Sequence, residues 1–210
     1  MTCERTRCKC DSLLFSWQPR ESAVSALVGT AALLRPEVDR REVALVRDAQ
    51  RGSARALEQL FRLHWPRAYR AALLVVDDAA AAEDIAQESF LAAVRALDRF
   101  DRRRPFGPWL HRIVVNRAID WSRARTLRRE IGDTAVLEAA APVREIGGRA
   151  EDLAAALSEL GAEHRAVIVL RYLLDYTPGE IAELLDLPRG TVNSRLRRGL
   201  DRLEEAVQWT

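Results

Sequence analysis

The sequence predicts an all-α protein made of two small helical domains joined by a flexible linker, with a helix-turn-helix in the second domain. Alanine and leucine dominate the chain, strand-like alternation of apolar and polar residues is nearly absent, and the few glycines and prolines cluster at intervals. The length of 210 residues accommodates two hydrophobic cores. We expect an N-terminal extension at residues 1–41, a first domain at 42–127, a linker at 128–150 and a second domain at 151–210.

The N-terminal extension shows no pattern that continues into the first domain. Its apolar run at residues 22–34 is shorter than the roughly 20 residues that span a bilayer, so we expect no membrane insertion. Two interpretations stay open, a mobile or partner-bound segment and a misassigned translation start.

Cysteine occurs only in this extension, at Cys3, Cys8 and Cys10. Both domains therefore lack a disulfide framework, which favours a reducing cytoplasm as the location. The C-x4-C-x-C spacing offers three thiolate ligands to zinc, but the histidines that could complete the site lie far away in the sequence. We expect no metal or other cofactor, with a zinc site at these cysteines as the minor alternative.

The first domain opens with a nearly continuous helical pattern from about Glu42. Ser53 fits as the N-cap of a helix whose apolar face contains Leu57, Leu60 and Phe61. The Asp77-Asp78 pair interrupts the pattern, and we expect a turn there.

The next segment, AEDIAQESFLAAVRAL, predicts an amphipathic helix with an acidic outer face. Helical projection gathers a buried side of Ile85, Ala86, Ala92, Ala93 and Leu97. The opposite side carries Asp84, Gln87, Glu88 and Leu91. Residues 71–94 contain five acids and no base, so this face would repel DNA, and a leucine among acids favours a protein-binding surface. The alternative is a solvated acidic face with one stray leucine.

A basic loop and a basic helix follow. The stretch RRRPFG at residues 102–107 breaks the pattern, and Pro108 then opens a helix that carries Trp109 to Arg123. Residues 99–129 hold ten arginines and two aspartates, a net charge of +8. One stripe of this helix contains Trp109, Ile113, Asn116 and Asp120, with Arg112 and Arg123 beside it.

An amide beside aromatic and guanidinium groups suits an unstacked base of single-stranded DNA, so Asn116 and the arginines are candidate DNA contacts. The alternative is that Asn116 braces a neighbouring helix. For Trp109 we favour a role in core packing.

Periodicity fades between residues 128 and 149, where Gly132, Pro142 and the Gly147-Gly148 pair predict a flexible connector. Beyond it, TPGEIAELLDLPRGTVNSRLRRGL predicts two helices joined by a tight turn. Thr177 caps the first helix, Pro178 occupies its first position, and Glu180 completes a capping box. The pattern breaks at residues 187–190, and the second helix begins around Thr191.

On this second helix Val192, Leu196, Leu200 and Leu203 form a packed stripe. Hydroxyl, amide and guanidinium groups face away from it or lie on its flanks, and these groups bind base edges and phosphates. They belong to Asn193, Ser194, Arg195, Arg197 and Arg198. A packed helical hairpin with a solvated basic face is the alternative.

Together, the three segments resemble the extracytoplasmic-function sigma factors of the sigma-70 superfamily over roughly residues 42–205. AEDIAQESFLAAV is similar to the family's polymerase-binding helix. PFGPWLHRIVVNRAIDWSR is similar to its promoter-melting and minus-ten segment, and GEIAELLDLPRGTVNSRLRR to its minus-thirty-five helix-turn-helix. Two departures are Asn193, where a basic residue is usual, and Gly199, where alanine is common.

The resemblance implies a dissociable subunit that binds core RNA polymerase and directs it to promoter DNA, with an anti-sigma factor as a further partner. Core polymerase would contact Asp84, Gln87, Glu88 and Leu91. The minus-ten strand would contact Arg112, Asn116, Arg117, Asp120 and Arg123. The minus-thirty-five duplex would contact Asn193, Ser194, Arg195, Arg197 and Arg198.

Two other functions compete with this one. A polymerase-independent helix-turn-helix regulator explains the second domain equally well, but it does not explain an acidic helix followed directly by a segment of charge +8. An enzyme is the weakest alternative, because the sequence contains no phosphate loop, carboxylate cluster or nucleophile and base pair.

Overall fold

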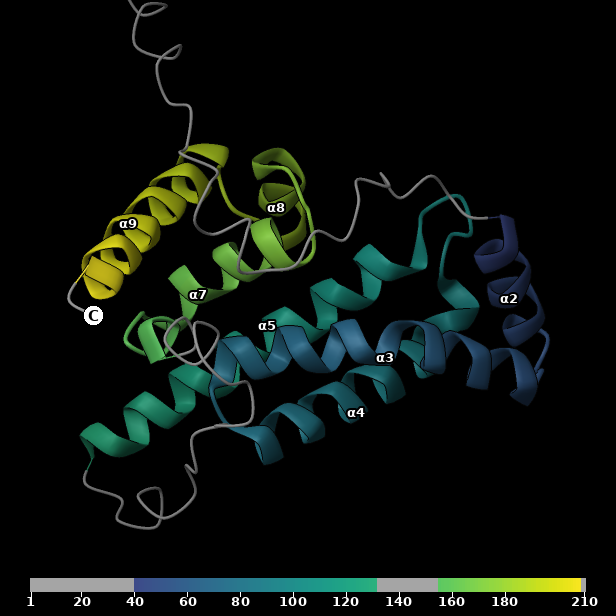
Figure 1. The fold of residues 1–210 in the computed structure, drawn as a ribbon. Coiled ribbons are helices and arrows are strands. Elements are labelled where there is room, and N and C mark those ends of the chain that lie inside the picture. The colour runs from purple at the N-terminus through teal and green to yellow at the C-terminus, as the bar shows by residue number, and fades with distance from the viewer. Residues whose placement is uncertain (1–39, 132–154, 209–210) are drawn as a thin grey trace, which may run out of the picture. The chain divides into compact units, whose positions relative to one another are not determined.

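The protein is all-α, as the sequence predicts. The computed structural model describes residues 40–131 and 155–208, and within these two ranges every regular element is a helix (Figure 1). None of the helices in these ranges is long and apolar enough to cross a membrane. Residues 1–39, which include the three cysteines, and most of the expected linker lie outside the described residues.

The first group of helices consists of α2 (Arg40–Gln50), α3 (Ala54–Val76), α4 (Ala79–Ala96) and α5 (Phe106–Glu130), with a short 3-10 turn, η1 (Leu97–Arg99), after α4. Helices α3, α4 and α5 all pack on one another, and α2 packs on α3. Fully buried alanines, among them Ala68, Ala71 and Ala72 of α3, line this contact. Because alanine is short, the helix axes can approach closely.

The expected helix boundaries at Ser53 and at the Asp77-Asp78 pair are confirmed. The Ser53 hydroxyl accepts a hydrogen bond from the backbone N–H of Ala56 at 3.3 Å. Asp77 ends α3 in the left-handed region at φ 54°, and the Asp78 carboxylate accepts from the N–H of Ala81 at 3.0 Å to start α4. Each break thus satisfies backbone groups that the helix ends leave free.

The second group contains α7 (Ala162–Ile168), a π-helical turn η3 (Val169–Leu173), α8 (Pro178–Leu185) and α9 (Arg189–Gln208). The predicted capping box is confirmed, since the Thr177 hydroxyl accepts from the N–H of Glu180 and the Glu180 carboxylate accepts from the N–H of Thr177. Helix α9 begins two residues before the expected Thr191.

The basic helix is longer than the sequence indicates. It runs to Glu130, so the expected start of the linker at residue 128 falls inside α5. Arg128 and Arg129 lie in its last turn, where positive charge stabilises the carboxyl end of a helix.

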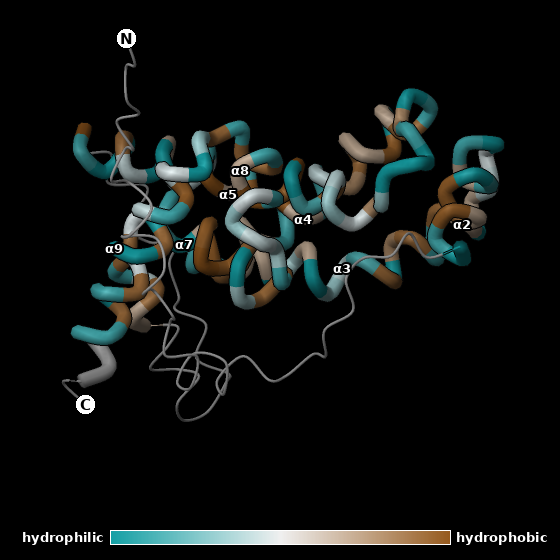
Figure 2. The backbone as a smooth tube through the Cα atoms, turned by 90° about the horizontal axis from the view of Figure 1, so that it is seen from above, coloured by the Kyte–Doolittle hydropathy of each residue, from teal (hydrophilic) through white to brown (hydrophobic). Residues whose placement is uncertain are grey.

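The two groups of helices contact each other. Helix α5 packs on α7 and α8, and α3 packs on α7 and η3. Figure 2 shows hydrophobic and hydrophilic stretches alternating along the helices, as expected when each has one buried face. Because α5 and α9 both pack on α7 and α8, these contacts help to determine the direction in which the polar sides of α5 and α9 point.

Candidate polymerase- and DNA-binding surfaces

The first candidate site is the α4 surface, formed by Asp84, Gln87, Glu88 and Leu91. All four side chains are exposed, as expected, while Ile85, Ala86, Ala93 and Leu97 are buried. Leu91 is 54% exposed, and Val94 one turn further is 44% exposed. A large apolar side chain among acids is costly in water and favourable against a protein partner.

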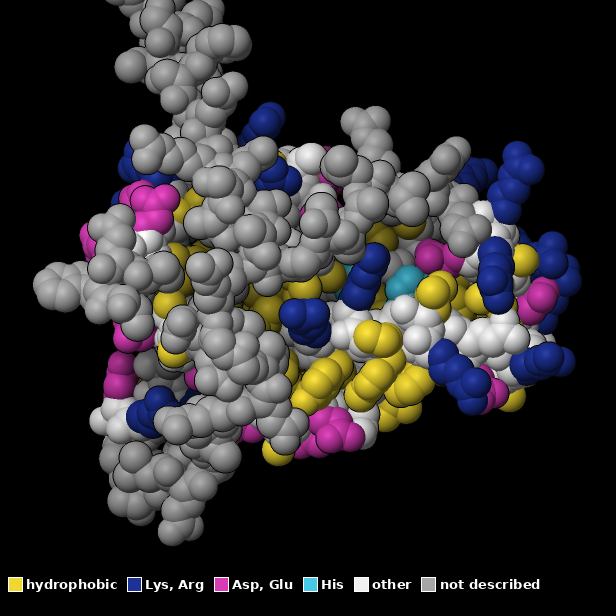
Figure 3. Space-filling model, in the orientation of Figure 1, with side chains coloured by type: hydrophobic (Ala, Val, Ile, Leu, Met, Phe, Trp, Pro, Cys, Tyr) yellow, Lys and Arg dark blue, Asp and Glu magenta, His cyan; other side chains and the backbone are white. Residues whose placement is uncertain are grey.

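The apolar part of this surface continues onto α3, a feature that the sequence pattern does not indicate. Phe61, expected on the apolar face of α3, is 38% exposed. Its ring lies 4.9 Å from Phe90 of α4 and 4.8 Å from Trp65, measured between centroids. Figure 3 shows hydrophobic side chains on the surface over α3 and α4, next to acidic ones. Only the packing of α3 against α4 reveals this continuity.

The second candidate site is the α5 surface, formed by Arg112, Asn116, Arg117, Asp120 and Arg123. Arg112, Asp120 and Arg123 are exposed, and Asn116 and Arg117 are partly buried. Trp109 packs on the core as expected, with its ring 4.6 Å from Phe100 and 5.5 Å from Phe106.

Acidic partners constrain two arginines of the α5 surface. Arg117 Nη1 lies 2.6 Å from Glu88 Oε2, which links this surface directly to the α4 surface. Arg123 Nη1 lies 3.8 Å from Asp120 Oδ1. Such exposed pairs contribute at most about 1 kcal/mol, so either arginine can exchange its partner for a phosphate at small cost.

A residue distant in sequence sets the start of α5. Pro105, the N-cap, provides no side-chain hydrogen bond, but Glu42 Oε1 of α2 accepts from the N–H of Phe106 at 2.7 Å. Glu42 Oε2 also lies 3.3 Å from His64 Nε2. Burial raises the pKa of Glu42, but His64 and the Phe106 and Gly107 N–H groups outweigh it and leave that pKa below its usual value. The carboxylate thus caps α5 as an anion.

The third candidate site is the α9 surface, formed by Asn193, Ser194, Arg195, Arg197 and Arg198. Asn193, Arg197 and Arg198 are exposed, and Ser194 and Arg195 are partly buried. On the opposite side Val192, Leu196 and Leu203 are buried, as expected, and Leu200 is partly buried. The helix-turn-helix geometry therefore presents the predicted polar residues outward.

Gly199 is a contact point between α9 and α7. A Cβ at this position would lie 2.7 Å from Cδ1 of Ile168 and 3.5 Å from its Cγ1. The sequence alone indicates only a helix-weakening glycine at this position. The structure adds a packing reason for it, because the missing side chain lets Ile168 approach the α9 backbone.

One acid joins the second and third surfaces. Glu163 of α7 pairs through Oε1 with Arg123 of α5 and through Oε2 with Arg195 of α9. The hydrogen bond to Arg123 is the main cause that lowers the pKa of Glu163, and the same bond raises the pKa of Arg123. No local sequence pattern indicates this cluster, because Glu163 lies 40 residues from Arg123 and 32 residues from Arg195.

Family comparisons match the same parts of the chain. Residues 60–128 match the model described as Sigma-70 region 2, and residues 150–203 match the model described as Sigma-70, region 4. The α4 and α5 surfaces lie in the first segment, and the α9 surface lies in the second.

The individual proteins to which the chain is similar are also sigma factors. The chain is 34% identical to the ECF RNA polymerase sigma factor SigL of Mycobacterium tuberculosis, with 79% of this chain and 97% of SigL covered. It is 29% identical to SigW of Bacillus subtilis, with coverage of 78% and 95%. The sigma factor RpoE, solved in complex with the anti-sigma factor NepR from Bartonella quintana, shares 25% identity at a TM-score of 0.60, with coverage of 72% and 96%.

Proposed function

The chain belongs to the extracytoplasmic-function sigma factors of the sigma-70 family, and we propose that it binds core RNA polymerase through α4 and promoter DNA through α5 and α9. It is an alternative sigma factor, a subunit that gives the polymerase promoter specificity. We expect it to act in the cytoplasm, where core polymerase and promoter DNA are found.

The observation that carries this proposal is the order and chemistry of the three surfaces. An exposed leucine among acids on α4 is followed by a helix with exposed arginines, and then by a helix-turn-helix with an outward polar face. A protein partner suits the first surface, and nucleic acid suits the other two. A polymerase-independent regulator would have no use for the first surface.

On the α5 surface, we propose that Asn116 receives a base of the minus-ten non-template strand. The amide can hydrogen-bond the edge of an unstacked base, while Arg112, Arg117 and Arg123 hold the flanking phosphates. Capture of a flipped base offsets an unstacking cost of a few kcal/mol, so strand opening needs no ATP. Asp120 would orient Arg123 through the pair described above.

On the α9 surface, we propose that the arginines and Asn193 read the minus-thirty-five duplex. A guanidinium that contacts one guanine through two hydrogen bonds contributes about 1 to 3 kcal/mol of discrimination. Residues 42–127 would form the polymerase and minus-ten domain, residues 151–210 the minus-thirty-five domain, and residues 128–150 the connection that sets the spacing between the two elements.

An anti-sigma factor is the further partner that we propose. RpoE, a relative of similar fold, is solved in complex with the anti-sigma factor NepR. A partner of this kind would cover the exposed leucine and the basic surfaces together.

In vitro transcription with a promoter library tests the proposal. Purified chain is added to core RNA polymerase, and the transcripts are sequenced to recover the promoters that were used. We expect enrichment of one pair of elements with a fixed spacing, only when both components are present. Selection of a single duplex motif by the chain alone, with no transcription, would instead identify a polymerase-independent regulator.

A further inference from the structure

We propose that α2 takes part in promoter opening by holding the loop at residues 101–105, with Glu42 and Gln50 as positioning residues that act without touching DNA. This inference rests on the proposed function, because the loop leads directly into the α5 surface. Glu42 and Gln50 lie near the two ends of α2, and each binds one end of the loop. Helix α2 therefore determines how the loop is presented to a partner.

Gln50 holds the start of the loop. Its side-chain Nε2 donates to the carbonyl oxygen of Leu97 at 2.9 Å and to that of Phe100 at 3.0 Å. Phe100 follows the last residue of η1, so its carbonyl has no partner in a continuing helix. The Phe100 ring is buried and lies 4.6 Å from the ring of Trp109, between centroids. The backbone just before the loop is thus fixed by both an amide and an aromatic contact.

Glu42 holds the end of the loop. Its carboxylate accepts from the N–H of Phe106 at 2.7 Å and lies 3.3 Å from His64 Nε2. Pro105 offers no side-chain cap, so this carboxylate satisfies a backbone N–H that the first turn of α5 would leave free. A Cβ on Gly107 would lie 3.3 Å from Cε1 of His64. The pair of Glu42 and His64 therefore fits closely against the start of α5.

Between these two contacts, the loop forms a turn that presents three arginines. Asp101 Oδ1 accepts from the N–H of Arg103 at 3.0 Å, and the Asp101 carbonyl accepts from the N–H of Arg104 at 2.9 Å. Arg102, Arg103 and Arg104 are all exposed. Figure 1 shows the loop beside α2, at the end of α5 away from α9. Exposed guanidinium groups suit phosphates, so the loop arginines would contact the backbone of the strand that the α5 surface opens.

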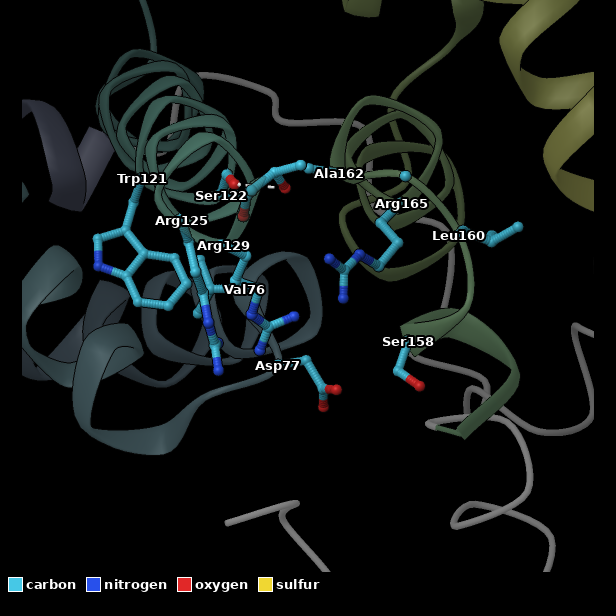
Figure 4. Close-up of a pocket in the computed structure, with 12 residues that line it drawn as sticks. Val76, Asp77, Trp121, Ser122, Arg125, Arg129, Ser158, Leu160, Ala162 and Arg165 are labelled. Carbon is cyan, nitrogen blue, oxygen red and sulfur yellow. Dashed lines mark hydrogen bonds between the residues drawn. The ribbon is translucent and has the colours of Figure 1, made fainter. Parts of the chain in front are cut away.

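Not every arginine of α5 is available to DNA in this way. The side chain of Arg125 is only 11% exposed, and its Nη1 lies 3.6 Å from Asp78 Oδ2. Its guanidinium carbon lies 5.1 Å from the centroid of the Trp121 ring. Figure 4 shows Trp121 and Arg125 at a pocket of about 250 Å³. Arg125 is therefore engaged within the protein, whereas the loop arginines face solvent.

The benefit of α2 lies in the order that it gives the loop before DNA binds. A loop that is fixed at both ends loses less conformational entropy when it contacts the strand than a loop that must first be ordered. The arginines are then already in place when the base at Asn116 leaves the duplex. Helix α2 thus favours opening through the loop, with no DNA contact of its own.

Hydrogen–deuterium exchange of the full chain tests whether α2 holds the loop. Glu42→Gln keeps the size of the side chain but removes the charge that pairs with His64 and strengthens the cap. We expect the amides of the loop and of Phe106 to exchange about fivefold faster. Glu58→Gln is the matched control, since Glu58 is an exposed acid of α3 and its replacement removes the same charge. Gln50→Leu removes both hydrogen bonds at the other end and should also speed exchange in the loop.

Strand opening by the holoenzyme tests the consequence for function. With 2-aminopurine in the minus-ten strand, Glu42→Gln should open the promoter about fivefold more slowly, because the loop must be ordered during opening. Its affinity for core polymerase should stay within about twofold of the parent, since α2 lies outside the α4 surface. Glu58→Gln should match the parent in both measurements.

A double-mutant cycle shows whether Glu42 acts through the loop. Replacement of Arg102, Arg103 and Arg104 by glutamine should slow opening by itself. Glu42→Gln should then slow that chain by less than about twofold more, because the groups that it positions are gone. Losses that multiply independently would mean that Glu42 only supports the fold, and they would overturn the proposal.

These measurements separate the possible failures. If Glu42→Gln and Gln50→Leu exchange no faster than Glu58→Gln, α2 does not hold the loop, whatever the polymerase does. If Glu42→Gln loses polymerase affinity as strongly as opening, its role is not in positioning the loop. If the parent holoenzyme opens no promoter, the proposed function is wrong, and the exchange rates still decide whether α2 holds the loop. Thermal unfolding of each variant checks that the fold is retained.

Discussion

Leu91 is the residue whose exposure argues most directly for a protein partner. Leu91→Arg places a charge in the centre of the α4 surface, so we expect loss of core polymerase affinity by about tenfold or more, as at the centre of other interfaces. The fold should be unaffected because the side chain is 54% exposed. Fluorescence anisotropy with labelled chain measures the affinity.

Leu127→Arg is the matched control for this experiment, since Leu127 on α5 is 57% exposed and lies outside the α4 surface. It should leave polymerase affinity nearly unchanged. If both variants lost the same polymerase affinity, the loss would come from the added charge or from reduced solubility. The α4 surface would then not be the polymerase-binding site.

Asn116 is the residue that we propose to act in strand opening and not in polymerase binding. Asn116→Ala removes the amide that we propose for the flipped base, so promoter opening should fall by about tenfold or more. Polymerase affinity should stay within about twofold, because Asn116 lies outside the α4 surface. Fluorescence of 2-aminopurine in the minus-ten strand reports the opening, and a parallel loss of both activities would contradict this division of labour.

The buried imidazole of His111 predicts a pH dependence of stability. Burial, followed by the electrostatic effects of the neighbouring His64 and Arg67, lowers the pKa of His111 from its usual 6.5 to about 3. Between these values the unfolded chain binds a proton that the folded chain does not, so the free energy of unfolding must fall as the pH falls. Each pKa unit of difference corresponds to about 1.4 kcal/mol. Across this pH window the free energy of unfolding therefore falls by a few kcal/mol at most.

Urea unfolding at several pH values between 7 and 4 measures this slope. His111→Gln should flatten it, although His164, whose pKa burial and the nearby arginines also lower, leaves a residual slope in the same direction. Glu42 adds a further loss below its usual pKa of 4.5, because its folded pKa is lowered. An unchanged slope in His111→Gln would show that this histidine is not buried in neutral form.

At the scale of single elements, α9 depends on the contact between Gly199 and Ile168. Gly199→Ala alone gains about 1 kcal/mol of helix propensity but creates the close contact with Ile168 Cδ1, and the two effects oppose each other. Ile168→Val removes Cδ1 at a cost of about 0.5 to 1.5 kcal/mol. The glycine substitution should therefore be more favourable in the valine background.

A double-mutant cycle from four urea titrations measures this coupling. We expect a favourable interaction of at least about 0.5 kcal/mol between the two substitutions. Additive free energies would mean that α7 and α9 adjust freely and that Gly199 has no packing role.

Helix ends that are capped by residues close in the sequence could be predicted from the sequence. The caps at Ser53, Asp78 and Thr177 involve residues at most three positions apart, so composition and spacing suffice to place them. The outward positions on α4 and α9 follow from helical periodicity in the same way. By contrast, the cap of α5 comes from Glu42, 64 residues away, and no local pattern indicates it.

Long-range contacts explain the remaining differences. The exposure of Phe61 depends on how α3 packs against α4, and the pairing of Arg123 with Arg195 through Glu163 depends on how α5, α7 and α9 meet. Periodicity defines one face of one helix and carries no information on which helix covers it. The helix faces on which the candidate residues lie were therefore predictable, but the contacts between these residues were not.

In the whole molecule, the proposed function gives the three surfaces different roles within one initiation complex. The α4 surface would supply attachment to the polymerase, while the α5 and α9 surfaces would supply sequence recognition that is useful only after attachment. Such a division would make promoter binding conditional on polymerase. Salt should weaken the DNA contacts more than the α4 contact, because arginine–phosphate pairing releases counterions.

The most direct test of the central claim is strand opening at one selected promoter, followed by 2-aminopurine fluorescence in the minus-ten strand. The chain alone, core polymerase alone and the two together are compared at equal concentrations. We expect opening only when both are present. Opening by core polymerase without the chain, or tight duplex binding by the chain that core polymerase does not change, would contradict it.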